Sequence, residues 1–156
     1  MRKNLSRSVT IFAFMFLVAC GALSVRAQSQ SSAHQESLYK RLGGYDALAA
    51  VTDDFINGLA TDKQLGRFFK GASTDSQKRI RQLVLDQLCA ATGGPCYYIG
   101  RSMKTVHTGL GITEEDWNIA VKLLTQTLDK FKVGKAERDD LFKILLTLKP
   151  DIVEKR

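Results

Sequence analysis

The sequence predicts an all-α domain preceded by a segment that does not belong to it. From Glu36 onward, apolar residues recur at three- and four-residue spacing, with no sustained apolar–polar alternation of the kind that half-buried strands show. The whole chain contains only two prolines, Pro95 and Pro150, so little interrupts long helices. With 44% hydrophobic residues in a chain of 156, one domain of this class can bury a core.

Residues 1–27 have the features of an export signal. Basic residues precede an apolar run, 9–18, that is too short to span a bilayer comfortably. A Leu-Val-Ala-Cys sequence ending at Cys20 resembles a bacterial lipobox, whose cysteine is lipidated, whereas Ala27 ends a competing cleavage site. An uncleaved membrane anchor is the third interpretation. All three place the domain outside a bacterial cytoplasm, either in the periplasm or tethered to a membrane through Cys20.

Residues 28–35 form a polar spacer rich in Gln and Ser, and the folded domain is expected over 36–156. The formal net charge is +7, but four basic residues lie in the first 27 positions, which leaves +3 for the rest of the chain. Because no basic cluster with interleaved aromatic residues remains, nucleic-acid binding is not expected.

The first long helix is expected over 45–60, where one inward stripe is formed by Leu48, Val51, Thr52, Phe55, Ile56 and Leu59. A short helical turn should then end at Phe68-Phe69. Thr74 and Gln77 have the spacing of a capping box, so the next helix is expected to begin there. Its inner stripe consists of Ile80, Leu83, Val84, Gln87, Leu88 and Ala91. Gln87 is the polar member, and it lies either at the rim of a helix interface or as a donor inside a pocket.

The triplet Gly93-Gly94-Pro95 should stop that helix. A short helix is then expected to carry Met103, Val106, His107 and Leu110 on one side. The next helix should begin over 113–116, where acidic residues suit the positive end of the helix dipole, and it should close at 133–134. A last helix is expected over 135–149.

The sequence contains two histidines, and only His107 is expected inside the folded domain, since His34 lies in the spacer. The chain has no Cys-x-x-Cys-His motif, so covalent c-type haem attachment is not indicated, and a metal site built from several histidines is not expected. A single histidine on an apolar helix face suits either a core position or the axial ligand of a haem.

Four motifs that occur in order decide between these interpretations. They are Leu38-Tyr39-x-Arg41-Leu42-Gly43-Gly44, Phe68-Phe69, Gly93-Gly94-Pro95 and Tyr98-x-Gly100-Arg101-x-Met103-x-x-x-His107-x-Gly109-Leu110-Gly111-Ile112-Thr113. This series, over about residues 36–154, resembles the group 1 truncated hemoglobins. The resemblance implies a two-over-two helical sandwich that encloses a b-type haem, with His107 as the protein ligand of the iron.

The resemblance also implies which other residues surround the haem. The side opposite His107 is expected to be lined by Phe55, Ile56, Ile80 and Val84, and one phenylalanine of Phe68-Phe69 to pack against the cofactor. Met103 lies one turn before His107, on the same side of the haem. Arg101 and Lys104 are candidates to pair with the haem propionates, and solvated charges are the equal alternative.

The sequence departs from this family where a bound gas would lie. Group 1 truncated hemoglobins commonly carry Phe-Tyr where this chain has Phe55-Ile56, and the tyrosine hydroxyl bonds to the ligand. An apolar pocket would deny dioxygen a hydrogen bond worth roughly 1 to 3 kcal/mol. Gln87 is the nearest residue in sequence that could replace it, ahead of Tyr97 or Tyr98.

The expected function is reversible binding of dioxygen, or of NO or CO, by an exported haem-binding truncated globin. Nitric oxide dioxygenation, an enzyme activity, is the first alternative, and the missing tyrosine disfavours it. A haem-free helical interaction domain is the second, and the intact motif around His107 disfavours that. No reductase can be named from the sequence. Export to an oxidising compartment would allow Cys89 and Cys96 to pair, with two free thiols as the alternative.

Overall fold

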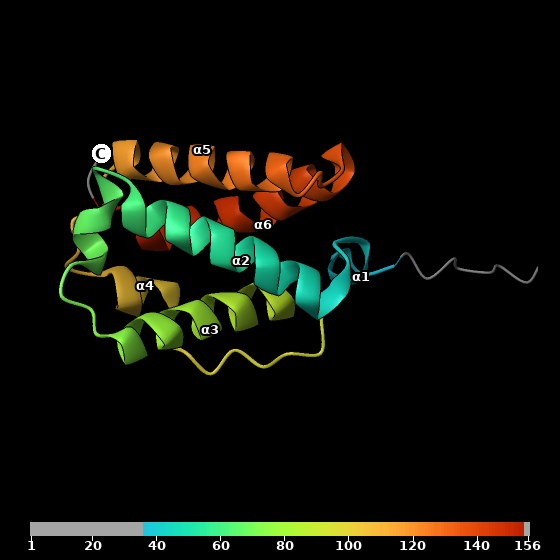
Figure 1. Ribbon diagram of the computed structural model, residues 1–156, viewed down its shortest axis with the longest axis horizontal. Coiled ribbons are helices and arrows are strands. Elements are labelled where there is room, and N and C mark those ends of the chain that lie inside the picture. Colours follow the sequence, from blue (N-terminus) through green and yellow to red (C-terminus); the bar gives the residue numbers. More distant parts are fainter. Residues whose placement is uncertain (1–35, 155–156) are drawn as a thin grey trace, which may run out of the picture. The chain divides into compact units, whose positions relative to one another are not determined.

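The computed structural model describes residues 36–154, so the predicted signal segment and spacer, with Cys20 and His34, lie outside the described residues. Within 36–154 the secondary structure is entirely helical, as predicted (Figure 1). The elements are α1 (Leu38–Arg41), α2 (Gly44–Thr61), η1 (Leu65–Phe69, a 3-10 helix), α3 (Thr74–Ala91), α4 (Met103–His107), α5 (Glu114–Lys130) and α6 (Lys135–Ile152). None of these helices is both long enough and apolar enough to cross a membrane.

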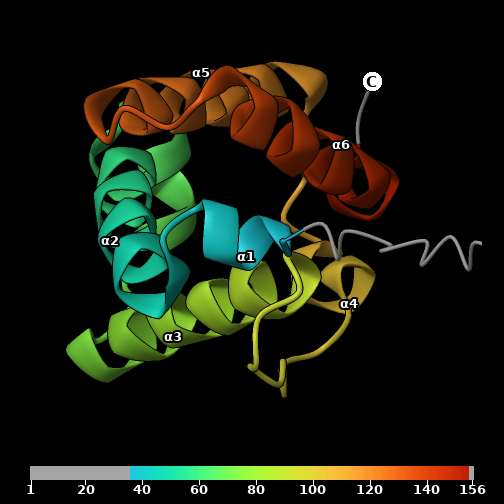
Figure 2. The same cartoon turned by 90° about the vertical axis from the view of Figure 1, so that its right-hand side faces the viewer.

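The four long helices form two layers. In both views α5 and α6 lie side by side in the upper layer, and α2 and α3 form the other layer (Figures 1 and 2). Helix α2 packs against both α3 and α5 and so joins the layers, while the short α4 packs against α6. This is the two-over-two sandwich that the sequence predicted.

The predicted cap of α3 is wrong by one residue. Ser73, not Thr74, is the N-cap, and its hydroxyl accepts a hydrogen bond from the Ser76 amide. Gln77 donates its side-chain amide to the Ala72 carbonyl instead of closing a capping box. Serine is preferred over threonine as an N-cap residue, and in the adjacent pair Ser73-Thr74 the serine takes that position. Helix α5 begins where it was predicted, and there Thr113 and Asp116 form a capping box that was not predicted.

Two other helix boundaries differ from the prediction. Helix α4 ends at His107, and Leu110 lies outside it, because the chain turns through Gly109 at a φ of 88°. Helix α6 continues past Pro150 to Ile152. A proline in the last turn removes only one helical hydrogen bond, which is why it does not stop the helix there.

The core lies on a different face of α3 from the one the sequence indicated. The fully buried residues of α3 are Leu85 and Cys89, which pack with Leu48 of α2. The predicted stripe that includes Ile80 and Val84 is only half-buried. Helix α3 therefore has two apolar faces, and just one of them is filled by the packing of α2. A second core cluster joins α1, α2, α5 and α6 and contains Leu38, Val51, Leu124, Leu128 and Leu141.

The two cysteines of the domain form the predicted disulfide. Cys89, near the end of α3, pairs with Cys96 across the Gly93-Gly94-Pro95 turn, with a Cα–Cα distance of 5.7 Å. Cys89 is completely buried in the cluster with Leu48 and Leu85. The bond therefore attaches the segment 93–102, which leads into α4, to the core of the α2–α3 layer.

This disulfide predicts the thiol content of the folded protein. Alkylation without reductant should leave Cys89 and Cys96 unmodified, and alkylation after reduction should add two labels, as measured by intact mass. Closing so short a loop should stabilise the fold by roughly 2 to 3 kcal/mol on the loop-entropy model. Two labels added before reduction would contradict the pairing.

Candidate functional site

His107 lies at the end of α4 with its imidazole half-buried. Its Nδ1 is 2.7 Å from the Met103 carbonyl oxygen. Because a carbonyl can only accept a hydrogen bond, Nδ1 carries the proton and Nε2 has a free lone pair. No residue within 36–154 bonds to Nε2, so this nitrogen is available to a metal.

The chain before α4 is held in a fixed conformation. The hydroxyl of Tyr98 donates to the Arg101 carbonyl at 2.6 Å, and burial raises the pKa of this hydroxyl, which keeps the proton on the donor. Ser102 then caps α4 by accepting a hydrogen bond from the Thr105 amide. Together with the disulfide at Cys96, these contacts fix where α4 begins.

The chain after α4 is held by the carboxylate of Glu154. Its two oxygens accept hydrogen bonds from the backbone amides of Gly109 at 2.6 Å and of Gly111 at 2.5 Å. The Glu154 amide donates in turn to the Ile112 carbonyl at 2.9 Å. The end of the α6 segment thus clamps the loop that follows His107. This contact has no local signal in the sequence, because Glu154 is more than forty residues away from Gly109 along the chain.

The turn that carries the phenylalanine pair is fixed by a buried carboxylate, Asp116. Its oxygens accept hydrogen bonds from Gln64 and Arg67 of the η1 region, each at 2.7 Å, and from Thr113. Burial alone would raise the pKa of Asp116, but the hydrogen bonds from Gln64, Thr113 and Arg67 outweigh it and hold the pKa far below its usual value. Asp116 therefore stays ionised and holds η1 against α5.

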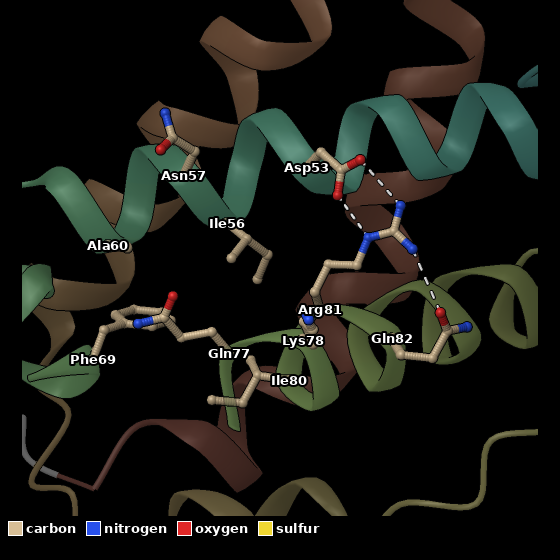
Figure 3. Close-up of a pocket in the computed structure, with 10 residues that line it drawn as sticks. All are labelled: Asp53, Ile56, Asn57, Ala60, Phe69, Gln77, Lys78, Ile80, Arg81 and Gln82. Carbon is tan, nitrogen blue, oxygen red and sulfur yellow. Dashed lines mark hydrogen bonds and ion pairs between the residues drawn. The ribbon is translucent and has the colours of Figure 1, made fainter. Parts of the chain in front are cut away.

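A pocket of about 590 Å³ opens between α2 and α3. Its apolar part includes Ile56 and Ile80, which were predicted on the gas side of the site, and Phe69, one of the two phenylalanines predicted to offer a contact to the cofactor (Figure 3). At its rim Arg81 forms a bidentate ion pair with Asp53, with Nε 2.6 Å from Oδ1. This ion pair ties α3 to α2 and keeps the mouth of the pocket polar.

The other predicted site residues lie elsewhere. Phe55 packs against the second core cluster, and Phe68, Val84 and Met103 are half-buried. Arg101 and Lys104 are exposed and form no ion pair within 36–154, so the structure leaves both interpretations of their role open. His107 does not line the pocket between α2 and α3.

Several apolar side chains of the helices α2, α3 and α4 stay half-buried and outside both core clusters. Ile56, Ile80, Val84 and Met103 are neither exposed nor packed in either core cluster. In the described part of the chain α3 packs on α2 and α4 packs on α6, but α3 and α4 do not pack closely on each other. A flat apolar group between α3 and α4, ligated at Nε2 of His107, would suit these residues. Within 36–154, no group of three or more His, Cys, Asp or Glu side chains could hold a metal ion. A metal bound through His107 would therefore need other ligands from a cofactor, as the iron of a haem has.

Two polar side chains of α2 and α3, those of Thr52 and Gln87, make no hydrogen bond within 36–154. Thr52 is completely buried on α2, and its hydroxyl oxygen makes no hydrogen bond in the described structure. Thr52 was predicted on the inward stripe of the first long helix, with no function assigned to its hydroxyl. The amide of Gln87 is half-buried and likewise bonds to no described side chain or backbone group. Both are donors that could serve a ligand.

Comparisons with known proteins agree with this geometry. The family model for bacterial-like globins matches residues 37–154. The group 1 truncated hemoglobin GlbN of Mycolicibacterium paratuberculosis is 32% identical over 120 residues, covering 77% of this chain and 86% of that protein. The crystal structure of truncated hemoglobin from Tetrahymena pyriformis, in its Fe(III) form, matches with a TM-score of 0.70 and 26% identity, covering 77% of this chain and 100% of that one. The 2/2 hemoglobin of Synechococcus sp., solved with covalently attached heme, matches with a TM-score of 0.69 and 25% identity, covering 76% and 98%.

Removing the carboxylate of Glu154 should loosen the loop after His107. Glu154→Ala should lower the free energy of unfolding by about 1 to 3 kcal/mol, since two charge-assisted hydrogen bonds are lost. Hydrogen exchange at the Gly109 and Gly111 amides should accelerate. Asp151→Ala is the matched control, because Asp151 is an exposed carboxylate nearby with no described partner. Equal effects of the two substitutions on stability and exchange would contradict the clamp.

Proposed function

This chain belongs to the bacterial-like globin family, as a group 1 truncated hemoglobin, and from that membership we propose that it binds a b-type haem through Nε2 of His107 and takes up a diatomic gas reversibly. A haem held there would supply an iron that can bind a diatomic gas. The observation that carries the proposal is the orientation of His107, whose Nδ1 proton is committed to the Met103 carbonyl.

Each residue of the site has a task in this proposal. The bond to Met103 fixes the ring of His107 and raises the basicity of Nε2. The Cys96 disulfide and the Glu154 clamp keep α4 in place. The half-buried apolar residues Ile80 and Val84 exclude water from the gas side.

The gas pocket favours ligands that need no hydrogen bond. Ile56 lines the pocket with a hydrocarbon side chain where a tyrosine hydroxyl would stabilise dioxygen. Carbon monoxide, which gains less from a hydrogen bond, should therefore be favoured strongly over dioxygen. Nitric oxide dioxygenation stays the alternative function, and the absence of a tyrosine at position 56 disfavours it.

The proposed place of action is outside the cytoplasm. Support comes from the signal-like residues 1–27 and from the disulfide between Cys89 and Cys96, because structural disulfides persist in oxidising compartments. In this proposal Cys20 is lipidated and holds the domain at a membrane, with processing after Ala27 as the alternative.

Replacing His107 tests the axial ligand. His107→Ala should weaken haem retention by more than about tenfold, because the iron loses its bond to the protein. The helices should survive, as measured by far-ultraviolet circular dichroism. Imidazole added to the variant should restore a six- or five-coordinate haem spectrum. Stoichiometric haem with an unchanged ferrous spectrum in His107→Ala would refute the assignment.

Adding a hydroxyl at position 56 tests the apolar pocket. Ile56→Tyr should slow dioxygen dissociation about 5- to 150-fold, the range that one hydrogen bond of roughly 1 to 3 kcal/mol supplies. Stopped-flow mixing measures this rate, and Ile56→Phe is the control that adds the ring without the hydroxyl. No slowing beyond that of the phenylalanine variant would mean that another donor already acts. Thr52→Val and Gln87→Leu would then identify which one.

A further inference from the structure

The segment between α3 and α4 exposes two large apolar side chains. Tyr97 is 87% exposed and Ile99 is 82% exposed, the highest values for large hydrophobic residues in the described structure. Tyr98 lies between them, and its hydroxyl is turned back to bond with the Arg101 carbonyl. Because the disulfide at Cys96 fixes the segment on the other side, Tyr97 and Ile99 form a constrained protrusion on the surface.

The domain begins beside this protrusion. The Tyr39 amide donates to the Thr92 carbonyl at 2.8 Å. A Cβ atom on Gly93 would lie 3.2 Å from that of Ser37, and one on Gly94 only 2.5 Å from the Tyr39 ring. The chain that arrives from the N-terminal segment therefore enters the domain against the start of the 93–102 segment.

We propose that Tyr97 and Ile99 insert into the surface of the phospholipid bilayer to which the chain is anchored. This inference rests on the anchoring at Cys20 proposed above. Tyrosine is enriched at membrane interfaces because its ring is apolar and its hydroxyl can stay hydrated, and an isoleucine beside it adds apolar area. The bilayer would then orient the domain with the 93–102 segment facing the lipid.

Charge and reach both fit this partner. No acidic residue occurs between Gly93 and Thr113, so nothing in this stretch is repelled by anionic headgroups. The sixteen peptide bonds that join Cys20 to Glu36 can span at most about 55 Å, which keeps the domain near the membrane. At the high effective concentration of so short a tether, a weak contact by two side chains is sufficient.

Site-specific photocrosslinking in the full chain tests the proposal. p-Benzoyl-phenylalanine at position 97 preserves the aromatic ring, and the holoprotein is reconstituted in vesicles of anionic phospholipid. Irradiation should yield a phospholipid adduct, detected by mass, at position 97. The matched control carries the same residue at position 146, because Leu146 is also exposed, at 57%, but belongs to α6 in the other layer (Figure 2). The control should yield no adduct.

A second variant checks that the apolar surface is responsible. Ile99→Asp, in the chain labelled at position 97, should reduce the lipid adduct at least about fivefold, since a charge is costly to bury in the apolar region. Leu146→Asp should leave it unchanged. No lipid adduct at position 97, or an adduct to a protein in whole membranes, would overturn the proposal. The haem spectrum of the same sample reports separately on the proposed gas-binding function, and retention in the membrane fraction reports on the anchor.

Discussion

The site depends on holding a helix that is too short to be stable alone. Helix α4 contains five residues, and isolated helices of that length do not form in water. Its conformation must therefore come from contacts at its two ends and along α6. The Ser102 cap and the disulfide-bound segment hold the start of α4, and the Glu154 carboxylate holds the loop that follows its last residue. His107 is the last residue of this helix, so its position is set by residues that never touch a ligand.

The same structure leaves several apolar side chains half-buried and outside both core clusters. Leu85 and Cys89 use one face of α3 to pack on α2, while Ile80 and Val84 on another face are left half-buried. A chain selected only for packing would be expected to bury these side chains fully, because protein interiors are normally packed as densely as organic crystals. These half-buried apolar residues are therefore suited to contact a cofactor. Haem binding should raise the free energy of unfolding above that of the polypeptide alone.

Elements with strong local signals could be predicted from the sequence, and contacts between distant residues could not. The bounds of α2 and the start of α5 followed from apolar periodicity and from the acidic residues at 113–116, whereas α5 ends at Lys130, before the predicted close at 133–134. The filled face of α3 was assigned wrongly, because periodicity shows that a face is apolar but not whether side chains or a cofactor will cover it. His107 was predicted as the iron ligand from its position in a family motif. Glu154 was not found, since it reaches Gly109 only after α6 has folded back across the domain.

His107 is held between the two layers of the sandwich, and this has a mechanical consequence. The disulfide attaches the start of its segment to Cys89, which is buried in the α2–α3 layer. Glu154 attaches the end of the segment to α6 in the other layer. The separation of the layers is in turn fixed where Asp54 of α2 accepts a hydrogen bond from Thr127 of α5 at 3.0 Å and pairs with Lys130. The two ends of the segment that carries His107 are therefore attached to different layers, so the position of its imidazole depends on how the layers pack as well as on the residues beside it.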